Sequence, residues 1–411
     1  MAQATRFDYC APVQQPPARL RLKKDVVAAI RRGHPWIFAA ALERPARELA
    51  AGSVVDVVAP GGQEFLARGF YDPDGPIAVR VLTRDPDVRL DAAFVRARVL
   101  SACALRRTAA HELDGDALRL LNGEGDVVPG LVLDAYADTG VVRFDGMAAE
   151  RAWAPHARTI FEAVREGGIP LVRVWARPSE GRAGGGHALV GDAPRGLIMV
   201  REASLRFEVD VVHGQKTGLF LDQRPNRARV RDLAAGQRVL NLFAYTGGFS
   251  VAAALGGARQ VTTVDLARPA VDAARRNFAH SGAPAEAHEF VAADCRAFLT
   301  DAAARGRRWD LAVCDPPSFA PSEKAKPAAL VAYRGLNAQV AQVVAPGGLL
   351  ATASCSSHVG MDDFTATVAA GCADAGRSAR VVHAGGAGPD HPVSVAFPEG
   401  RYLKFLLLRL D

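Results

Sequence analysis

The sequence of 411 residues predicts an α/β protein in which a C-terminal domain built on a parallel sheet follows two smaller N-terminal modules. Three observations predict this class. The chain is longer than one ordinary hydrophobic core requires. Short strand-like segments separated by Gly and Pro dominate its first part. From about residue 205 onward, strand, loop and helix patterns alternate, which is typical of a parallel sheet covered on both faces.

The N-terminal part is predicted to be a small β-rich domain over residues 19–85, preceded by a loose polar tail at 1–18 that contains three prolines. A short basic helix is expected over 26–32, and Gly33 ends it. The strand-like segments that follow lie at residues 53–58, 65–71 and 77–82.

A central mixed α/β domain is expected over residues 90–203. Helices are predicted at 91–107 and 149–165 from the helical spacing of their apolar residues. A glycine-rich stretch at 181–191 is predicted to be a flexible loop. The predicted strands of this domain are 118–121, 131–136, 141–144 and 171–175.

The C-terminal domain is expected over residues 205–411, and the sequence contains no internal repeat. Its apolar segments are short and are separated by helical patterns, so they are expected to form consecutive strands of one sheet. These strands are predicted at residues 239–242, 260–264, 287–291, 311–314, 349–353, 379–384 and 403–408.

Composition excludes several classes of protein. The formal charge of +6 is compatible with a nucleic-acid partner but does not require one. No apolar run is long enough to span a bilayer, and residues 1–12 lack the apolar core of a secretion signal, so we expect a cytoplasmic protein. The cysteines have no spacing typical of a metal site or a disulfide framework, and we expect free thiols and no bound metal. They are Cys10, Cys103, Cys295, Cys314, Cys355 and Cys372.

Residues 239–248 combine a buried strand, a turn containing Gly247 and Gly248, and the start of a helix. Doubly wound sheets hold nucleotide-like ligands at this position, and a carboxylate such as Asp265 at the end of the next strand accepts hydrogen bonds from ribose hydroxyls. The G-x-G-x-x-G pattern of dinucleotide sites is missing. Asp294 is expected near an adenine edge, as a helix N-cap, or as both.

The fourth predicted strand runs into Asp315-Pro-Pro-Ser-Phe. The two prolines restrict the backbone, so this loop has a fixed direction where the sheet faces the ligand. A loop of this type is typical of enzymes that methylate bases with S-adenosylmethionine (SAM), and the sequence therefore predicts SAM as the cofactor. The simpler interpretation is a proline turn after a core strand.

Cys355 follows the fifth predicted strand and is expected at the same edge of the sheet, one strand from Asp315. A thiolate that adds to carbon 6 of a pyrimidine makes carbon 5 able to accept a methyl group. We therefore predict Cys355 as a covalent nucleophile, whereas Cys314 is interpreted as core packing. His358 is expected either to tune Cys355 or to have a capping or surface role.

These segments together resemble the bacterial cytosine-5 rRNA methyltransferases that carry an N-terminal PUA domain. The resemblance covers about residues 20–411 and includes several motifs in order. The matching segments are 213–224, 241–249, 315–319, 354–356, 391–392 and 398–404, with a PUA-like start at 22–38 and a central-domain match at 121–130.

The resemblance implies a Rossmann-like class I methyltransferase domain behind a PUA-like RNA-binding domain. It implies methyl transfer from SAM to carbon 5 of a cytosine in large-subunit rRNA, with Cys355 as nucleophile and Asp315 holding the base edge. Lys216, Thr217 and Arg224 are expected to border the cofactor pocket. By position, this pocket comprises Gln223, Asn241, Phe243, Tyr245, Thr246, Gly247, Gly248, Asp265, Asp294 and Asp315.

The sequence departs from this family at Ser318, because related enzymes have a second Cys, and PUA-containing members commonly a Lys, at that position. The base that removes the carbon-5 proton is therefore unassigned. The target base must be flipped out of structured RNA to reach Cys355. The residues expected to contact RNA phosphates, unless they form ordinary solvated helix faces, are Lys23, Lys24, Arg31, Arg32, Lys216, Arg224 and Arg227, with Arg229 and Arg231 beside them.

Three alternatives stay open at the level of sequence. The first is an RNA methyltransferase that acts on a base nitrogen, for example of guanine, with Cys355 non-catalytic. The second is an RNA-binding or assembly protein with a vestigial SAM pocket, against which the intact Asp265, Asp315 and Cys355 argue. The third, a small-molecule methyltransferase, leaves two N-terminal modules unexplained. The sequence also leaves the oligomeric state open, with a homodimer among the options.

Overall fold

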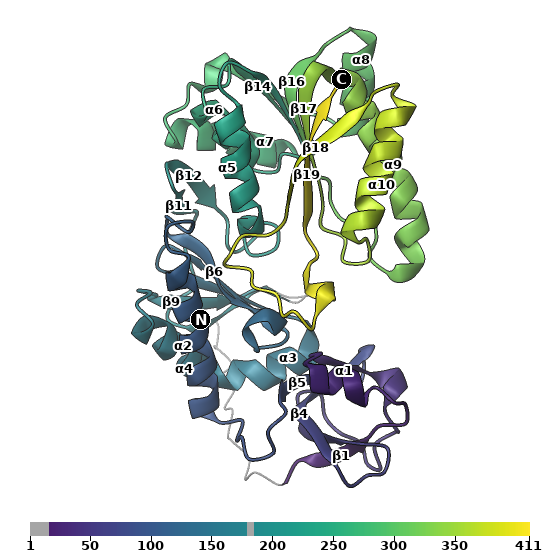
Figure 1. Ribbon diagram of the computed structural model, residues 1–411. Coiled ribbons are helices and arrows are strands. Elements are labelled where there is room, and N and C mark those ends of the chain that lie inside the picture. Colours follow the sequence, from purple (N-terminus) through teal and green to yellow (C-terminus); the bar gives the residue numbers. More distant parts are fainter. Residues whose placement is uncertain (1–15, 179–184) are drawn as a thin grey trace. The chain divides into compact units, whose positions relative to one another are not determined.

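The computed structural model describes residues 16–178 and 185–411, and it divides the chain into two compact units (Figure 1). One unit contains Met1–Thr108, Arg119–Pro194 and Val393–Phe397. The other contains Ala109–Leu118, Arg195–Pro392 and Pro398–Asp411. Most of the expected N-terminal tail, with Cys10, and the first part of the loop expected at 181–191 lie outside the described residues.

The first unit begins with a five-stranded sheet in the order β1-β3-β4-β5-β2. Helix α1 (Val27–Arg32) ends at Gly33, whose φ of 112° is readily adopted only by glycine. Leu20, Val55 and Val79 belong to the apolar core of this sheet. The strands are β1 (Ala18–Arg21), β2 (Trp36–Phe38), β3 (Val54–Val58), β4 (Phe65–Tyr71) and β5 (Ile77–Thr83).

A second five-stranded sheet follows, in the order β10-β9-β8-β7-β6, and helix α2 (Ala92–Thr108) packs on α4. The helix predicted at 149–165 is two helices, because Pro155 lies in a 3₁₀ turn between α3 (Gly146–Trp153) and α4 (Ala157–Glu166). The prediction of a loop at 181–191 was wrong for its last part, which forms β10. The strands are β6 (Ala117–Asn122), β7 (Leu131–Tyr136), β8 (Thr139–Phe144), β9 (Arg173–Ala176) and β10 (His187–Val190).

The second unit is built on a seven-stranded sheet in the order β15-β14-β13-β16-β17-β19-β18. All the pairings from β15 to β17 are parallel, whereas β19 runs antiparallel to both of its neighbours. The parallel sheet expected from the sequence is therefore present with one reversed strand. The strands are β13 (Arg238–Leu242), β14 (Gln260–Asp265), β15 (Glu289–Ala292), β16 (Trp309–Cys314), β17 (Val344–Ser354), β18 (Ala379–Gly385) and β19 (Lys404–Leu410).

Helices cover both faces of this sheet (Figure 1). One layer contains α5 (Arg224–Leu233), α6 (Gly248–Leu255) and α7 (Arg268–His280), and the other contains α8 (Cys295–Ala304), α9 (Lys326–Val343) and α10 (Met361–Asp374). A hairpin that the sequence did not predict, β11 (Ile198–Glu202) with β12 (Leu205–Val209), precedes them.

The strand order places β13 between β14 and β16. The chain therefore adds β14 and β15 on one side of β13 and then crosses to the other side to form β16. In open α/β sheets, ligands bind in the crevice outside the carboxyl ends of the strands at such a switch point. A ligand site is therefore expected among the segments that follow β13, β14, β16 and β17.

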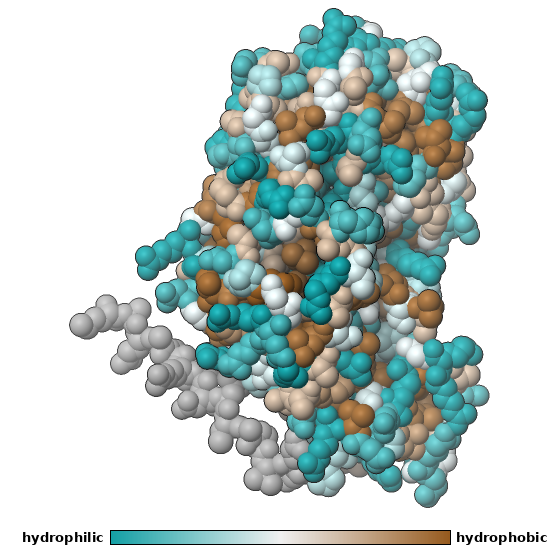
Figure 2. Space-filling model, turned by 60° about the vertical axis from the view of Figure 1, so that its left-hand side comes forward, coloured by the Kyte–Doolittle hydropathy of each residue, from teal (hydrophilic) through white to brown (hydrophobic). Residues whose placement is uncertain are grey.

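The surface drawn in Figure 2 mixes hydrophilic residues with small groups of hydrophobic ones. Within the described ranges, no helix combines the length and the apolar character that crossing a membrane requires. The same residues contain no group of three or more His, Cys, Asp or Glu side chains arranged to hold a metal ion.

Candidate active site at the carboxyl edge of the C-terminal sheet

The turn after β13 is a strained backbone segment. Phe243 and Tyr245 have φ values of 55° and 48°, in the left-handed region that residues with a Cβ rarely adopt. Gly247 has a φ of 81°, and a Cβ added there would lie 2.7 Å from the Cβ of Ala274. Such strain is retained where the surrounding structure imposes it, and it is concentrated at ligand sites. Gly248 is the first residue of α6 beyond this turn.

Asp265, at the end of β14, holds this turn in place. Its Oδ2 accepts a hydrogen bond from the Tyr245 amide at 2.7 Å, and its Oδ1 accepts one from the Ala267 amide at 2.9 Å. The carboxylate is only partly buried, and each of its oxygens has a second lone pair. It can therefore accept further hydrogen bonds from a ligand in the crevice.

Asn241 and Thr246 support the turn from beneath. The Asn241 side chain is buried and donates to the Ser250 hydroxyl at 2.8 Å, so it braces helix α6. The Thr246 carbonyl accepts a hydrogen bond from Asn277 at 2.9 Å. Asp294 caps helix α8 by accepting from the Ala297 amide at 2.9 Å, which is the cap that the sequence allowed.

Asp315 directly follows β16 and is held by a buried amide. Gln223 donates to Asp315 Oδ2 at 2.8 Å, and the Gln223 carbonyl accepts from Asn226 at 2.6 Å, which sets the orientation of the amide. Burial and the neighbouring Asp222 carboxylate raise the pKa of Asp315 to about 7. The carboxyl group can therefore exist in either protonation state near neutral pH.

Cys355 directly follows β17, and its side chain is partly exposed. Burial, Asp315 and Asp222 together raise the pKa of the Cys355 thiol to about 11, and Lys216 acts in the opposite direction. The charges of Asp315, Asp222 and Lys216 therefore act on the ionisation of Cys355. Without a proton acceptor, Cys355 is a thiol and a weak nucleophile at neutral pH.

A chain of hydroxyl groups joins the loops that carry Asp315 and Cys355. Ser318 Oγ lies 2.9 Å from Ser356 Oγ, which lies 2.9 Å from the Tyr333 hydroxyl. Ser354 donates to the same Tyr333 hydroxyl at 3.0 Å. His358 instead bonds to Glu323 at 3.3 Å; His358 is partly exposed and Glu323 is exposed.

Two residues of the site had no role assigned from the sequence. Asp222 accepts a hydrogen bond from the Tyr402 hydroxyl at 2.7 Å, and its other oxygen is buried without a hydrogen-bond partner. Lys404 is 2% exposed and donates to the carbonyls of Ser356 and Tyr402. Asp222 lies in segment 213–224 and Lys404 lies in segment 398–404. Both segments were recognised as motifs in the sequence, but neither residue was given a role there.

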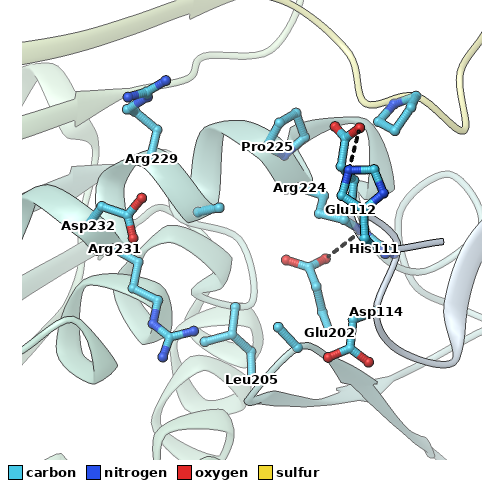
Figure 3. A pocket seen from close by; sticks show the side chains of 13 residues that line it. His111, Glu112, Asp114, Glu202, Leu205, Arg224, Pro225, Arg229, Arg231 and Asp232 are labelled. Atoms are coloured by element: carbon cyan, nitrogen blue, oxygen red, sulfur yellow. Dashed lines mark ion pairs between the residues drawn. The ribbon is translucent and has the colours of Figure 1, made fainter. Parts of the chain in front are cut away.

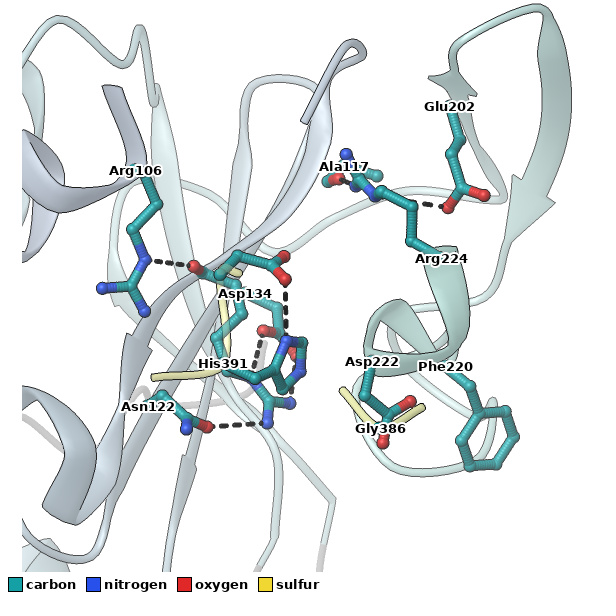
Figure 4. A network of polar contacts seen from close by, with 12 residues as sticks. Arg106, Ala117, Asn122, Asp134, Glu202, Phe220, Asp222, Arg224, Gly386 and His391 are labelled. Carbon is teal, nitrogen blue, oxygen red and sulfur yellow. Dashed lines mark hydrogen bonds and ion pairs between the residues drawn. The ribbon is translucent and has the colours of Figure 1, made fainter. Parts of the chain in front are cut away.

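Arg224 and Arg227 are not available for RNA, which corrects the prediction made from their position. Both are buried, and both pair with the buried carboxylate of Glu202. Arg224 also donates to the carbonyl of Ala117 (Figure 4), and Arg227 donates to the carbonyl of Phe220 at 2.7 Å. A charge neutralised inside the domain cannot contact a phosphate.

A cavity beside α5 is lined by Arg224, and by Arg229 and Arg231, which were predicted beside the RNA-contacting residues (Figure 3). Its wall contains both acidic and basic side chains, and none of them contributes to the cluster around Cys355. It is lined by His111, Glu112, Asp114, Glu202, Ala203, Leu205, Arg224, Pro225, Ala228, Arg229, Arg231, Asp232 and Pro389.

Comparison with known proteins identifies the family. A model of S-adenosylmethionine-dependent methyltransferases matches residues 185–393, and a model of PUA-like domains matches residues 20–84. The chain belongs to the PUA-domain SAM-dependent methyltransferases. The sequence-based resemblance, the fold class and SAM as the cofactor are thereby confirmed.

Several relatives of this methyltransferase are similar along almost its whole length. A Deinococcus radiodurans protein named ribosomal RNA large subunit methyltransferase is 38% identical over 98% of this chain and 100% of its own. A Klebsiella pneumoniae protein named ribosomal RNA large subunit methyltransferase I is 35% identical over 95% and 98%. A crystal structure of a methyltransferase complexed with SAH has a TM-score of 0.83 at 23% identity, covering 95% of this chain and 100% of that one.

The crevice of this methyltransferase fits an adenosyl cofactor. The turn at Gly247 has no room for a side chain, the Asp265 carboxylate is partly exposed beside it, and Asp315 follows the neighbouring strand. SAM supplies an electrophilic methyl group when it is bound. We expect the turn and Asp265 to hold the adenosyl part and the Asp315 loop to border the reacting end.

Proposed function

We propose that this enzyme transfers the methyl group of SAM to carbon 5 of a cytosine in large-subunit rRNA, through a covalent adduct with Cys355. The observation that carries the proposal is the convergence of Cys355 and Asp315 outside the carboxyl ends of adjacent strands β17 and β16. The names of the relatives from Deinococcus radiodurans and Klebsiella pneumoniae support rRNA as the substrate. The cytoplasmic location expected from the sequence belongs to the same proposal.

Cys355 and Asp315 act at successive steps of the proposed methyl transfer. The Cys355 thiolate bonds to carbon 6, and the electron pair of the carbon 5–carbon 6 double bond moves toward carbon 5 and the ring nitrogen N3. Protonated Asp315, which its pKa of about 7 makes available, can donate to N3 and stabilise the adduct. After methylation, a basic group or water takes the carbon-5 proton, and the electron pair of that C–H bond restores the double bond and expels the Cys355 thiolate. N3 returns its proton to the Asp315 carboxylate.

RNA contacts are assigned to exposed basic residues of the PUA-like domain. Lys23, Lys24, Arg31 and Arg32 are all exposed, although Arg31 also pairs with Glu64. Each phosphate contact made by such residues makes binding more sensitive to salt. Lys216 lies near Cys355 and is assigned to the flipped target nucleotide.

The second candidate is methylation of a base nitrogen, with Cys355 non-catalytic. One observation favours it, because the raised pKa of the Cys355 thiol leaves little thiolate at neutral pH. Nitrogen methylation needs no enzyme nucleophile, and Asp315 alone would orient the base.

The test uses unmodified large-subunit rRNA with labelled SAM, followed by nucleoside mass spectrometry and bisulfite sequencing. We expect label in 5-methylcytidine at a defined position. Cys355→Ala should abolish transfer while leaving SAM binding by calorimetry unchanged. Cys372→Ala, which removes a buried thiol on helix α10, is the matched control and should remain active. Label on guanine or on an amino nitrogen refutes the proposal, and full activity of Cys355→Ala refutes its covalent step.

A further inference from the structure

Tyr333 on helix α9 is fully buried, and its hydroxyl contacts the turn that carries Cys355. The hydroxyl accepts a hydrogen bond from Ser354 Oγ at 3.0 Å and lies 2.9 Å from Ser356 Oγ. Ser354 and Ser356 are the two neighbours of Cys355 in the chain, and both are buried. One phenol therefore holds the residues on both sides of the proposed nucleophile.

The same cluster includes the loop that begins at Asp315. Ser318 Oγ lies 2.9 Å from Ser356 Oγ, so the hydroxyl chain continues into this loop. The next residue, Phe319, packs its ring against the ring of Tyr333 with their centroids 4.7 Å apart. Two consecutive residues of the Asp315 loop thus contact the groups that hold the Cys355 turn.

The hydrogen bonds of this chain have a definite direction. Burial raises the pKa of Tyr333, so it stays a neutral phenol with a single proton. A buried hydroxyl proton needs an acceptor, and because Ser354 already donates to the phenol oxygen, the Tyr333 proton goes to Ser356. Ser356 then directs its own proton to Ser318. Ser318 is therefore the acceptor that satisfies a buried hydroxyl.

From this geometry we infer that Tyr333 and Ser318 are positioning residues that lock the Cys355 turn to the Asp315 loop. The lock keeps the thiol and the carboxyl group in one relative arrangement, and neither positioning residue acts on the substrate. It gives Ser318, where the sequence departs from its family, a role other than proton removal. The importance of the lock for methyl transfer rests on the proposed function, whereas the coupling of the two loops belongs to their side chains alone.

The test measures hydrogen–deuterium exchange of backbone amides by mass spectrometry, with neither RNA nor SAM present. Tyr333→Phe removes the hydroxyl and keeps the ring that packs on Phe319. The Ser356 amide donates to Ser354 Oγ at 3.3 Å, so protection of this turn depends on the hydroxyl that Tyr333 holds. Exchange in the peptide covering residues 354–359 should become about tenfold faster, because local opening no longer has to break the bonds to the phenol.

Ser318→Ala tests the link between the two loops. Ser318 is exposed, so the substitution should leave the fold intact, but it removes the acceptor of the buried Ser356 hydroxyl. Exchange at 354–359 should therefore rise although the substitution lies in the other loop. Ser318→Thr keeps a hydroxyl and should restore the wild-type exchange rate.

The matched control is Thr365→Val, which removes a hydroxyl that bonds at 2.8 Å to the carbonyl of Met361 within helix α10. It should leave exchange at 354–359 unchanged. Wild-type exchange of this peptide in Ser318→Ala overturns the link between the loops, and wild-type exchange in Tyr333→Phe overturns the role of the phenol.

Methyl transfer gives a second readout. Tyr333→Phe and Ser318→Ala should lower kcat about tenfold or more and leave SAM affinity and the KM for RNA close to wild type, because only the arrangement of the reacting groups is disturbed. Ser318→Thr should recover kcat. A purely structural role would lower the thermal unfolding temperature and leave kcat unchanged.

The exchange experiment is independent of the substrate test. If label appears on a base nitrogen while both variants expose the 354–359 peptide, only the proposed reaction fails. If cytosine is methylated while exchange stays at the wild-type rate in both variants, only the positioning role of Tyr333 and Ser318 fails.

Discussion

Replacing Asp315 by Asn should stabilise this enzyme at alkaline pH and have much less effect at acid pH. Burial and Asp222 raise the pKa of Asp315 from 3.8 to about 7, so the folded protein holds this proton more tightly than the unfolded chain does. The stability that the group contributes is therefore fully present below pH 3.8 and is lost as the pH rises through about 7. Asn stays neutral throughout and retains an oxygen that can accept from Gln223.

The size of the stability change follows from the shift in the pKa of Asp315. A shift from 3.8 to about 7 is about three pKa units, or about 4 kcal/mol at 1.36 kcal/mol per unit. Between about pH 5 and about pH 8.5, about 3 kcal/mol of this difference should develop, and partial solvent exposure reduces it toward 2 kcal/mol. At about 2–4 °C per kcal/mol, the gap in Tm between variant and wild type should widen by roughly 4–12 °C.

Differential scanning calorimetry of both proteins at the two pH values measures this gap. The matched control is Asp301→Asn, which removes an exposed carboxylate of helix α8 that pairs with Arg305, and its Tm offset should not depend on pH. Equal Tm offsets for Asp315→Asn at acid and alkaline pH would refute the reasoning. The result would mean that Asp315 is ionised in the folded protein as freely as in the unfolded one.

Three further predictions concern single contacts. Glu202→Ala should destabilise the methyltransferase unit by about 3–5 kcal/mol in urea unfolding, because it leaves the guanidinium of Arg227 buried and unpaired; a loss below about 1 kcal/mol would contradict this. Gly247→Ala should weaken SAM binding in calorimetry at least tenfold, because its Cβ would meet Ala274 at 2.7 Å where φ is 81°; unchanged affinity would remove the turn from the site. Asp265→Ala should also lower SAM affinity, by about 1–3 kcal/mol, since the ribose hydroxyls lose a carboxylate acceptor; if Asp265 only holds the Tyr245 amide, Tm should fall and the affinity should stay unchanged.

Much of the site could be predicted because its residues follow strands whose apolar patterns are local. Asp265 and Asp315 come directly after predicted strands and Cys355 comes two residues after one, and parallel strands bring their carboxyl ends to one edge. Predicting that these three residues converge therefore required only the correct order of strands and helices along the chain. The strand-like patterns also located the sheets of the N-terminal unit, although β1, β2 and β10, which have only three or four residues each, were not predicted.

Other features depend on partners that are distant in the sequence. Whether Arg227 lies on a solvated helix face or in a buried pair depends on Glu202, 25 positions earlier, and the helical pattern contains no sign of that carboxylate. The same holds for Asp222, which meets Tyr402 across 180 positions.

The sequence by itself determined the fold class, the cofactor and the two residues around which the reaction is proposed, because strand periodicity and short motifs are properties of neighbouring residues. Only the tertiary structure decided the chemical state of those residues. The reversed strand β19 brings Lys404 beside Ser354, and the start of α5 brings Gln223 to Asp315. Protonation depends on burial and on the charges nearby, and both are set by how distant segments pack.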